Sequence, residues 1–443
     1  MANPRSAARF LRNTFRPVLI RRFVTSLREE GWGMATAKAR IYMGMRLRGE
    51  ALSSLAPSEA GNREGETLHG SWLQLAQGGG FHVSSRRIGT APRLALIGDL
   101  NLPQCRKYRV EQLADFWRDQ GVYCEFAHYQ DIPRALRLMS TATHLMEYRL
   151  PVTPLTEMLR YEARRLRLPI LYDIDDPLFS VSAYETYGNM AEVDPGMKAH
   201  FLREAPKYLA MMNGADVLSL STPGLAEHAA LYSNRPIFLR RNFADAKTLK
   251  AGTRARTARV AEDGLFRIAF ASGSQGHEAD LATIAPVLEA FLAGGSDRRL
   301  MLLGHVDLKR LPGALADKAE VAAFSTYDKY LAALARADVA VMPLADDIFN
   351  RCKSAVRVID AASVSVPAIV GPVGDLPQMI RDGETGVVAD GPAAWAAALE
   401  MLSTNKGQAA AMGRAARTDL ETRWTGQAAD HIISPGLIDW VRG

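Results

Sequence analysis

Three charged side chains, Lys353, Arg357 and Asp360, are spaced so that one helix would present all of them on the same face. Separations of three and four residues bring side chains onto neighbouring turns of an α-helix. Lys353 would stand at the amino end, where free amides and the helix dipole already favour an anion such as a diphosphate. Asp360 would lie about 10 Å further along, within reach of the hydroxyls of an attached ribose. The spacing therefore indicates an anion site with a carboxylate beside it.

The helix that would carry these side chains is expected to begin near residues 352–354 and to end before Pro367, which lacks the amide hydrogen needed to continue it. Its inward face would consist of Ala355, Ile359 and Ala362. Taken alone, the three charges are more typical of a solvated helix surface with weak ion pairs than of a binding site. The surrounding sequence favours a binding site instead.

Residues 349–390 contain two motifs on either side of this helix, FNRCKS before it and DGETG after it. This arrangement resembles the donor-binding half of glycosyltransferases with the GT-B fold, of the retaining type that uses nucleotide sugars. In that family two glutamates, separated by seven residues, flank the helix. Here Cys352 stands at the first glutamate position and Asp360 at the second. A subgroup carries FNxxKS at this place, and the residues that match it are Phe349, Asn350, Lys353 and Ser354.

The resemblance implies a fold and a set of roles for this chain. The fold class would be α/β, specifically GT-B, with two Rossmann-like domains facing a cleft and a basic helical extension at the N-terminus. The catalytic residues would be Lys353, Asp360 and His277. The donor-binding residues would be Gly273, Ser274, Ser354, Arg357, Asn350, Gly374 and Asp375.

Strands and helices alternate from Arg93 onward, which predicts a parallel sheet with ligands at the carboxyl ends of its strands. The residues just after each predicted strand are therefore the candidates for contact with an acceptor. They are Tyr108, Arg149, Asp175 and Asp176, together with Arg109 in the same KYRV stretch. The clustered aspartates of YDIDD could suggest a metal, but alternate residues of a strand point to opposite faces. We expect neither a metal nor another cofactor.

A second α/β unit begins at Phe266, and its first strand runs into SGSQGHEAD. The glycines there allow a ligand to approach the backbone closely, and His277 would donate to a phosphate or to the sugar, or would simply cap the next helix. The SGSxxHxxD pattern is similar to the same subgroup of the family. The predicted domains are 66–245 and 265–420, with a linker at 246–264 and a C-terminal helix at 421–443 that crosses back to the first domain.

The composition is that of a globular protein, with 443 residues, 48% hydrophobic residues and a net charge of +6. Residues 1–50 hold 11 Lys and Arg against 3 Asp and Glu, so the basic excess belongs to the amino terminus. Within the expected extension, residues 1–65, an amphipathic helix at 9–30 would lie on an anionic membrane surface or pack on the next domain. The rest of the chain is near neutral, which disfavours nucleic acid as a partner.

These observations predict an enzyme that moves a sugar from a nucleoside-diphosphate sugar to a glycan or lipid-linked acceptor, with retention, in surface polysaccharide synthesis. Three cysteines without metal-type spacing, and no apolar run long enough to span a bilayer, favour the cytoplasm or the inner face of its membrane. Two alternatives stay open. One is a nucleotide-sugar epimerase of the same fold, and the other is a catalytically silent binding protein, suggested by Cys352 in place of glutamate.

Overall fold

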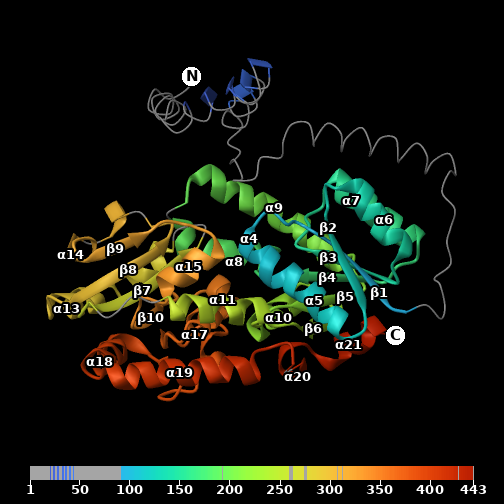
Figure 1. Cartoon of the computed structure of the whole chain (residues 1–443). Coiled ribbons are helices and arrows are strands. Elements are labelled where there is room, and N and C mark those ends of the chain that lie inside the picture. Colours follow the sequence, from blue (N-terminus) through green and yellow to red (C-terminus); the bar gives the residue numbers. More distant parts are fainter. Residues whose placement is uncertain are drawn as a thin grey trace, which may run out of the picture.

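The computed structural model describes scattered residues between 20 and 43 and then residues 91–442. Within that second range it leaves out 192, 259–262, 274–276, 307, 312 and 428. The described residues form two six-stranded parallel sheets flanked by helices (Figure 1). The predicted α/β class with two Rossmann-like units is therefore confirmed. Most of the basic helix expected at 9–30 lies outside the described residues.

The first sheet has the strand order β2-β1-β3-β4-β5-β6. Its central strands are runs of buried side chains, as expected where helices cover both faces of a parallel sheet. The strands are β1 (Arg93–Gly98), β2 (Tyr123–His128), β3 (His144–Tyr148), β4 (Ile170–Ile174), β5 (Val217–Leu220) and β6 (Ile237–Leu239).

The helices of the first domain include a π-helical turn, η1 (Arg106–Glu111), between α4 (Pro103–Cys105) and α5 (Gln112–Asp119). Single π-turns within helices are frequent at functional sites, and η1 carries Tyr108. The remaining helices of this domain are α6 (Ile132–Thr141), α7 (Pro154–Arg165), α8 (Val181–Thr186), η2 (Gly188–Ala191), α9 (Pro195–Asn213) and α10 (Pro223–Ala230).

The second sheet has the order β12-β11-β10-β7-β8-β9. Its strands are β7 (Phe266–Gly273), β8 (Arg298–Gly304), β9 (Ala319–Ala322), β10 (Val339–Met342), β11 (Ala368–Val370) and β12 (Gly386–Val388). Its helices and helical turns are α12 (Glu278–Ala282), α13 (Ala285–Ala293), η3 (Leu308–Arg310), α14 (Gly313–Ala316), α15 (Tyr327–Leu334), α16 (Ile348–Arg351), α17 (Val356–Ser363), η4 (Leu376–Met379), α18 (Gly391–Thr404) and α19 (Lys406–Arg423).

The segment between the two sheets is not an unstructured linker. Most of the expected linker, 246–264, is helix α11 (Ala246–Thr257), which packs against α15 and α17. The sequence showed no apolar stripe here because the buried positions are small or polar. They are Thr248, Ala251, Gly252 and Ala255.

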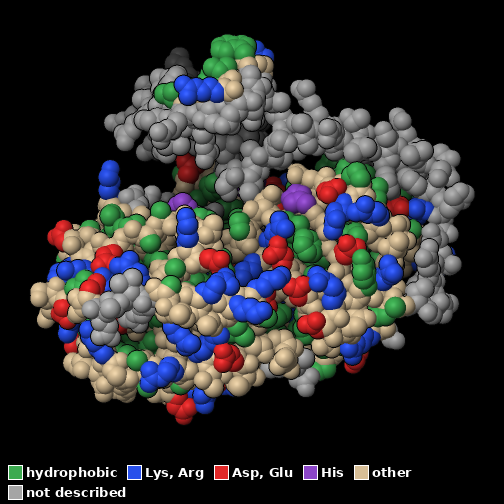
Figure 2. Space-filling view, viewed as in Figure 1, with side chains coloured by type: hydrophobic (Ala, Val, Ile, Leu, Met, Phe, Trp, Pro, Cys, Tyr) green, Lys and Arg blue, Asp and Glu red, His purple; other side chains and the backbone are tan. Residues whose placement is uncertain are grey.

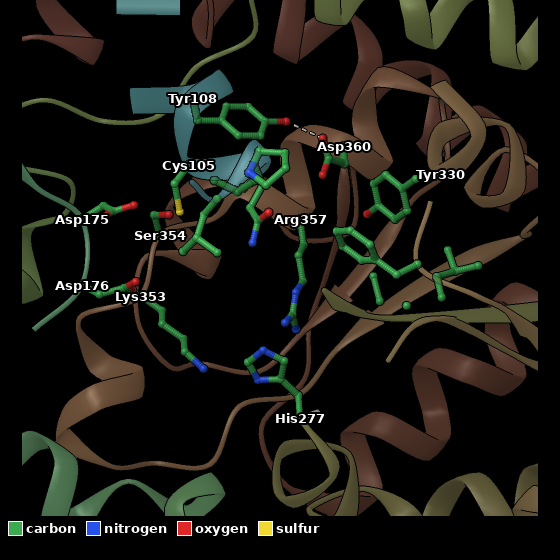
Figure 3. A pocket seen from close by; sticks show the side chains of 18 of the residues that line it. Cys105, Tyr108, Asp175, Asp176, His277, Tyr330, Lys353, Ser354, Arg357 and Asp360 are labelled. Carbon is green, nitrogen blue, oxygen red and sulfur yellow. Dashed lines mark hydrogen bonds between the residues drawn. The ribbon is translucent and has the colours of Figure 1, made fainter. Parts of the chain in front are cut away.

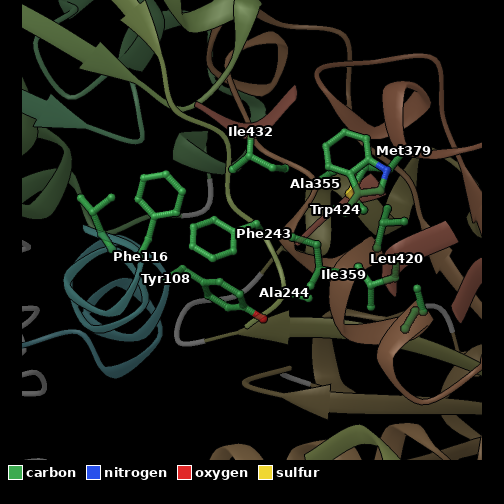
Figure 4. Packing of buried hydrophobic residues seen from close by; sticks show 14 of the residues in the cluster. Tyr108, Phe116, Phe243, Ala244, Ala355, Ile359, Met379, Leu420, Trp424 and Ile432 are labelled. Atoms are coloured by element: carbon green, nitrogen blue, oxygen red, sulfur yellow. The ribbon is translucent and has the colours of Figure 1, made fainter. Parts of the chain in front are cut away.

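The C-terminal segment returns to the first domain through α20 (Ala429–Ile432) and α21 (Pro435–Arg442), along the lower side of Figure 1. Ile433 forms an antiparallel bridge with Arg240, and the ring of Trp440 lies 4.9 Å from that of His144. Trp424, only 1% exposed, belongs to a core cluster that includes residues of both domains (Figure 4). The two domains therefore share part of one hydrophobic core.

Basic and acidic side chains are interspersed over the face of the molecule seen in Figure 2. Within the described residues, no helix has both the length and the apolar character that crossing a bilayer requires.

Candidate functional site

A cavity of about 710 Å³ lies between the two domains. It is lined from the first domain by residues that follow β1, β3 and β4, and from the second domain by residues that follow β7, β8 and β10. Ligands of parallel α/β sheets bind at this edge of the strands. The volume is within the range of pockets that hold small molecules and cofactors.

Three nitrogen-bearing side chains of the second domain, Lys353, Arg357 and His277, converge on the open space of this cavity (Figure 3). The helix was expected to start at residues 352–354, but α17 begins at Val356. The Asp347 side chain caps a separate short helix, α16, so the chain turns before α17 starts. Lys353 therefore lies in the turn before the helix and not on it.

Lys353 extends across the cleft to the first domain. Its Nζ donates a hydrogen bond of 2.8 Å to the hydroxyl of Tyr187 and lies 3.7 Å from Asp280. Burial lowers the pKa of Lys353 to about 8, although the Asp280 charge opposes that shift. Among the described residues, Arg357 and Asp360 form no ion pair, although both were expected on one face of the same helix. The Arg357 guanidinium instead faces the cavity (Figure 3).

His277 is held by Asp280, whose side chain is fully buried. Nδ1 of His277 lies 3.1 Å from Oδ2 of Asp280. Burial, and then the charge of Arg357, lower the pKa of His277 to about 3, so its ring is neutral near pH 7. His277 thus provides a polar but uncharged group between two cations.

Asp360 lies at the far end of the cavity, where four hydroxyl or ammonium groups surround it, those of Tyr108, Tyr327, Tyr330 and Lys107. Its Oδ1 accepts hydrogen bonds from the hydroxyls of Tyr108 and Tyr327, the second at 2.7 Å. Burial raises the pKa of Asp360, and the nearby charge of Lys107 opposes the shift. The ammonium of Lys107 lies 3.7 Å from the centre of the Tyr108 ring and 4.0 Å from that of Tyr327. Burial lowers the pKa of Lys107 to about 8.

The first domain contributes a carboxylate pair with one arginine. Nη1 of Arg149 lies 3.4 Å from Asp175 and 3.5 Å from Asp176, and all three line the cavity. Arg149 has a φ of 54°, a left-handed conformation uncommon outside glycine. Burial and the neighbouring Asp175 charge raise the pKa of Asp176. These carboxylates face the cations of the second domain across the cavity (Figure 3).

Of the predicted site residues, Ser354 also lines the cavity, and Asn242 donates a hydrogen bond of 2.9 Å to its hydroxyl. Arg109 does not line it. The Arg109 guanidinium is fully buried and binds both oxygens of Asp173, which also pairs with Arg240. Arg109 is thus a structural residue, because the first aspartate of YDIDD points into the core.

Three predicted donor-binding residues, Asn350, Gly374 and Asp375, do not line the cavity but contact residues that do or that lie beside them. Asn350 is fully buried and donates a hydrogen bond to Asp280, and Asp375 pairs with Arg241. Gly374 has a φ of 68° and packs against the backbone of residues 350–353. Gly273 ends β7, and Ser274 lies outside the described residues.

Sequence reasoning missed several lining residues that act in this network. They are Lys107, Tyr187, Tyr327 and Tyr330, to which Asp280 must be added as the partner of His277. Lys107 is the first residue of the KYRV stretch and Asp280 is the last residue of the SGSxxHxxD pattern. Both motifs were recognised in the sequence, so these two residues could have been predicted from them. The tyrosines carry no comparable signal.

Cys352, at the position where the family has its first glutamate, does not line the cavity. Its side chain is 1% exposed, its Sγ lies 3.8 Å from the carbonyl of Gly224, and burial raises its pKa to about 12. No group of three His, Cys, Asp or Glu side chains suited to a metal ion is found in the part of the chain that the structure describes.

Comparison with known proteins supports this view of the second domain. Residues 272–405 match the family model for glycosyl transferases group 1. No curated protein sequence matches the chain.

Among solved structures, the chain is similar to sucrose-phosphate synthase from Thermosynechococcus elongatus, with a TM-score of 0.51 and 15% identity over 76% of this chain and 96% of the other. It is also similar to a glycosyltransferase from Rickettsia africae ESF-5, with a TM-score of 0.52 and 9% identity over 80% and 99% of the two chains. At these identities the similarity shows the fold alone, and the fold is GT-B.

Proposed function

We propose that this protein is a glycosyltransferase that moves a sugar from a nucleoside-diphosphate sugar to a glycan or lipid-linked acceptor. The observation that carries the proposal is the convergence of Lys353 and Arg357 on a cavity opposite the carboxylates of Asp175 and Asp176. Two fixed cations provide the charge that a diphosphate needs, and carboxylates accept hydrogen bonds from sugar hydroxyls. The family match covers the cationic side of this cavity.

The donor would lie on the second domain. Lys353 and Arg357 would bind the diphosphate, without a metal ion, together with Ser354 and the turn at residues 273–274. The ribose would approach Asp360, whose oxygen now accepts from Tyr108 and Tyr327. Ribose hydroxyls are donors of the same kind, so nucleotide binding would exchange one set of donors for another.

The reaction we propose proceeds with retention. The bond between C1 of the sugar and the phosphate oxygen breaks, and the leaving diphosphate keeps the electron pair. The acceptor oxygen forms a bond to C1 from the same face, and its proton passes to the leaving phosphate oxygen. Lys353 and Arg357 would stabilise the negative charge that develops on the diphosphate, which requires no protein nucleophile.

The acceptor would bind against the first domain, where Arg149, Asp175 and Asp176 line the cavity. We propose a surface polysaccharide precursor as the acceptor, handled on the cytoplasmic side of the membrane. The basic segment at residues 9–30 would hold the enzyme to anionic lipid. Its binding to anionic vesicles, compared with neutral ones, tests that part of the proposal separately.

Titration calorimetry with UDP, GDP and ADP tests the donor site first. We expect one nucleoside diphosphate to bind, the Lys353→Ala variant to bind it more weakly, and Lys247→Ala, on the exposed side of α11, to bind it normally. Failure of every nucleotide to bind would refute the proposal. Incubation with the matching nucleotide sugar and a lipid extract then tests transfer. Conversion of the donor without acceptor would indicate an epimerase, and binding without turnover would indicate a silent protein.

A further inference from the structure

Asp280 accepts hydrogen bonds from three directions. Its Oδ1 accepts from the amide nitrogen of Ala345 at 3.2 Å and from Nδ2 of Asn350 at 3.0 Å. Its Oδ2 accepts from Nδ2 of Asn189, in the first domain, at 2.9 Å, and Lys353 lies 3.7 Å away. A carboxyl group surrounded by donors and a cation is ionised, and an ionised carboxylate only accepts hydrogen bonds.

This arrangement determines where the proton of His277 resides. Nδ1 of His277 faces Oδ2 of Asp280 at 3.1 Å, so Nδ1 must carry the hydrogen. Burial and the flanking cations keep the ring neutral, because they lower the pKa of His277 to about 3. A neutral ring has one N–H, so Nε2, on the other side of the ring, carries a lone pair. His277 lines the cavity, and its ring extends toward the end of Arg357 (Figure 3).

A lone pair at Nε2 excludes one ligand group and suits another. The oxygens of a diphosphate only accept hydrogen bonds, so they would meet Nε2 as a second acceptor. A hydroxyl can donate to it. Because His277 belongs to the second domain and lies between Lys353 and Arg357, the nearest hydroxyls of a bound donor would be those of its sugar.

The geometry points to His277 as a specificity-determining residue that accepts a hydrogen bond at Nε2 from a hydroxyl of the donor sugar, with Asp280 as the positioning residue that fixes its tautomer. This inference rests on the proposed function, since it requires a nucleotide sugar in the cavity. It differs from the expectation that His277 donates to a phosphate or to the sugar, because Nε2 accepts the hydrogen bond here. Asp280 is also bound by Asn189, so the tautomer is fixed by contacts from both domains.

Nitrogen NMR of protein labelled in its histidine rings tests the tautomer without any substrate. The signal of His277 is identified by its loss in His277→Gln. We expect Nδ1 to be protonated and Nε2 to be unprotonated across pH 6 to 8. A protonated Nε2 in the wild-type protein would overturn the inference. In Asp280→Asn, whose amide can also donate, the preference for the Nδ1–H form should weaken.

Binding measurements test the ligand. For His277→Phe, which keeps a ring but has no acceptor, we expect unchanged affinity for the nucleoside diphosphate and about tenfold weaker binding of its sugar conjugate. His277→Gln can present an amide oxygen near the position of Nε2 and should recover part of that loss. An equal loss for both ligands in His277→Phe would refute the sugar contact. If the wild-type protein binds no nucleotide at all, the proposed function fails instead.

Discussion

The hydroxyl of Tyr108 donates a hydrogen bond across the cleft to the carboxylate of Asp360, so the two domains meet at the carboxylate proposed for the ribose. Tyr327, from the second domain, donates to the same oxygen. Asp360 is 5% exposed, and burial raises its pKa against the opposing charge of Lys107. The negative charge of Asp360 therefore lowers the free energy of unfolding. Such a cost is common at binding and catalytic sites.

Asp360→Asn should thus be no less stable than the wild-type protein at pH 7, while it binds the nucleotide more weakly. The asparagine carbonyl still accepts from Tyr108 and Tyr327, and Lys107, with a pKa already lowered to about 8, can lose its proton. Because the pKa of Asp360 is higher in the folded state, its stabilising contribution is complete below the ordinary value of 3.8 and is lost as pH rises through the folded value.

Urea denaturation at several pH values measures this effect. The stability difference between Asp360→Asn and the wild-type protein should vanish near pH 3.5 and grow in favour of the variant as the pH rises. A variant that loses stability with rising pH, relative to wild type, would contradict the assignment of a raised pKa to Asp360.

Nucleotide affinity should fall as the pH rises through about 8, because Lys353 then loses its charge. Below that pH the ammonium is present and attracts the diphosphate. Lys353→Arg, whose guanidinium stays charged, should remove this dependence between pH 7 and 9.5. Lys353→Ala should lower the affinity by about 10- to 100-fold at pH 7, as expected for a charge-assisted hydrogen bond. Calorimetry in buffers of different ionisation enthalpy would also show proton uptake on binding near pH 8.

The buried group of Arg109, Asp173 and Arg240 should dominate the stability of the first domain. One carboxylate serves two guanidiniums, and all three side chains are fully buried. Although burial raises the pKa of Asp173, the two arginines keep it below its ordinary value. Asp173→Asn should lower the free energy of unfolding by about 3–5 kcal/mol, because it leaves two buried cations without a counter-charge.

The matched control for this prediction is Arg164→Ala. The pair of Arg164 with Asp216 is 3.0 Å long, but its side chains are 46% and 38% exposed. Its loss should cost less than about 1 kcal/mol. Similar destabilisation by the two substitutions in urea would show that burial does not set the importance of the Asp173 group.

Much of the fold was predictable because its signals are local. Runs such as Leu94–Ile97 are apolar throughout, as a strand covered on both faces requires, and their alternation with helices predicts a parallel sheet. The position of Asp360 on α17 followed from spacing. Helix α11 was missed because small side chains such as Ala251 and Gly252 bury a helix without an apolar stripe.

The site was predicted less completely, because the direction of a polar side chain depends on its tertiary partners. Arg109 and Arg149 both lie in segments that follow a strand. The Arg109 side chain binds Asp173 in the core, whereas the Arg149 side chain lines the cavity. Lys353 was expected on a helix, but the cap at Asp347 starts a separate helix before it. The tyrosines around Asp360 come from η1 and α15, which lie more than two hundred residues apart in the chain.

Gly374 should control the position of Lys353 through the backbone. A Cβ on Gly374 would lie 2.7 Å from the carbonyl oxygen of Asn350 and 3.1 Å from that of Lys353, and its φ of 68° also disfavours a side chain. Gly374→Ala should therefore displace the turn that carries Lys353. We expect it to cost about 2–4 kcal/mol of stability, from overpacking and strain together, and to weaken nucleotide binding.

Gly383→Ala separates these two causes. Gly383 has a similar φ of 76°, but nothing lies within 4 Å of its added Cβ. This variant should lose only the cost of strain, about 1–2 kcal/mol, and bind the nucleotide as the wild-type protein does. Equal nucleotide affinity in both variants would mean that the backbone of residues 350–353 does not position Lys353. A weaker affinity in Gly374→Ala alone would show that Lys353 is positioned by the close approach of the turn before α17 to Gly374.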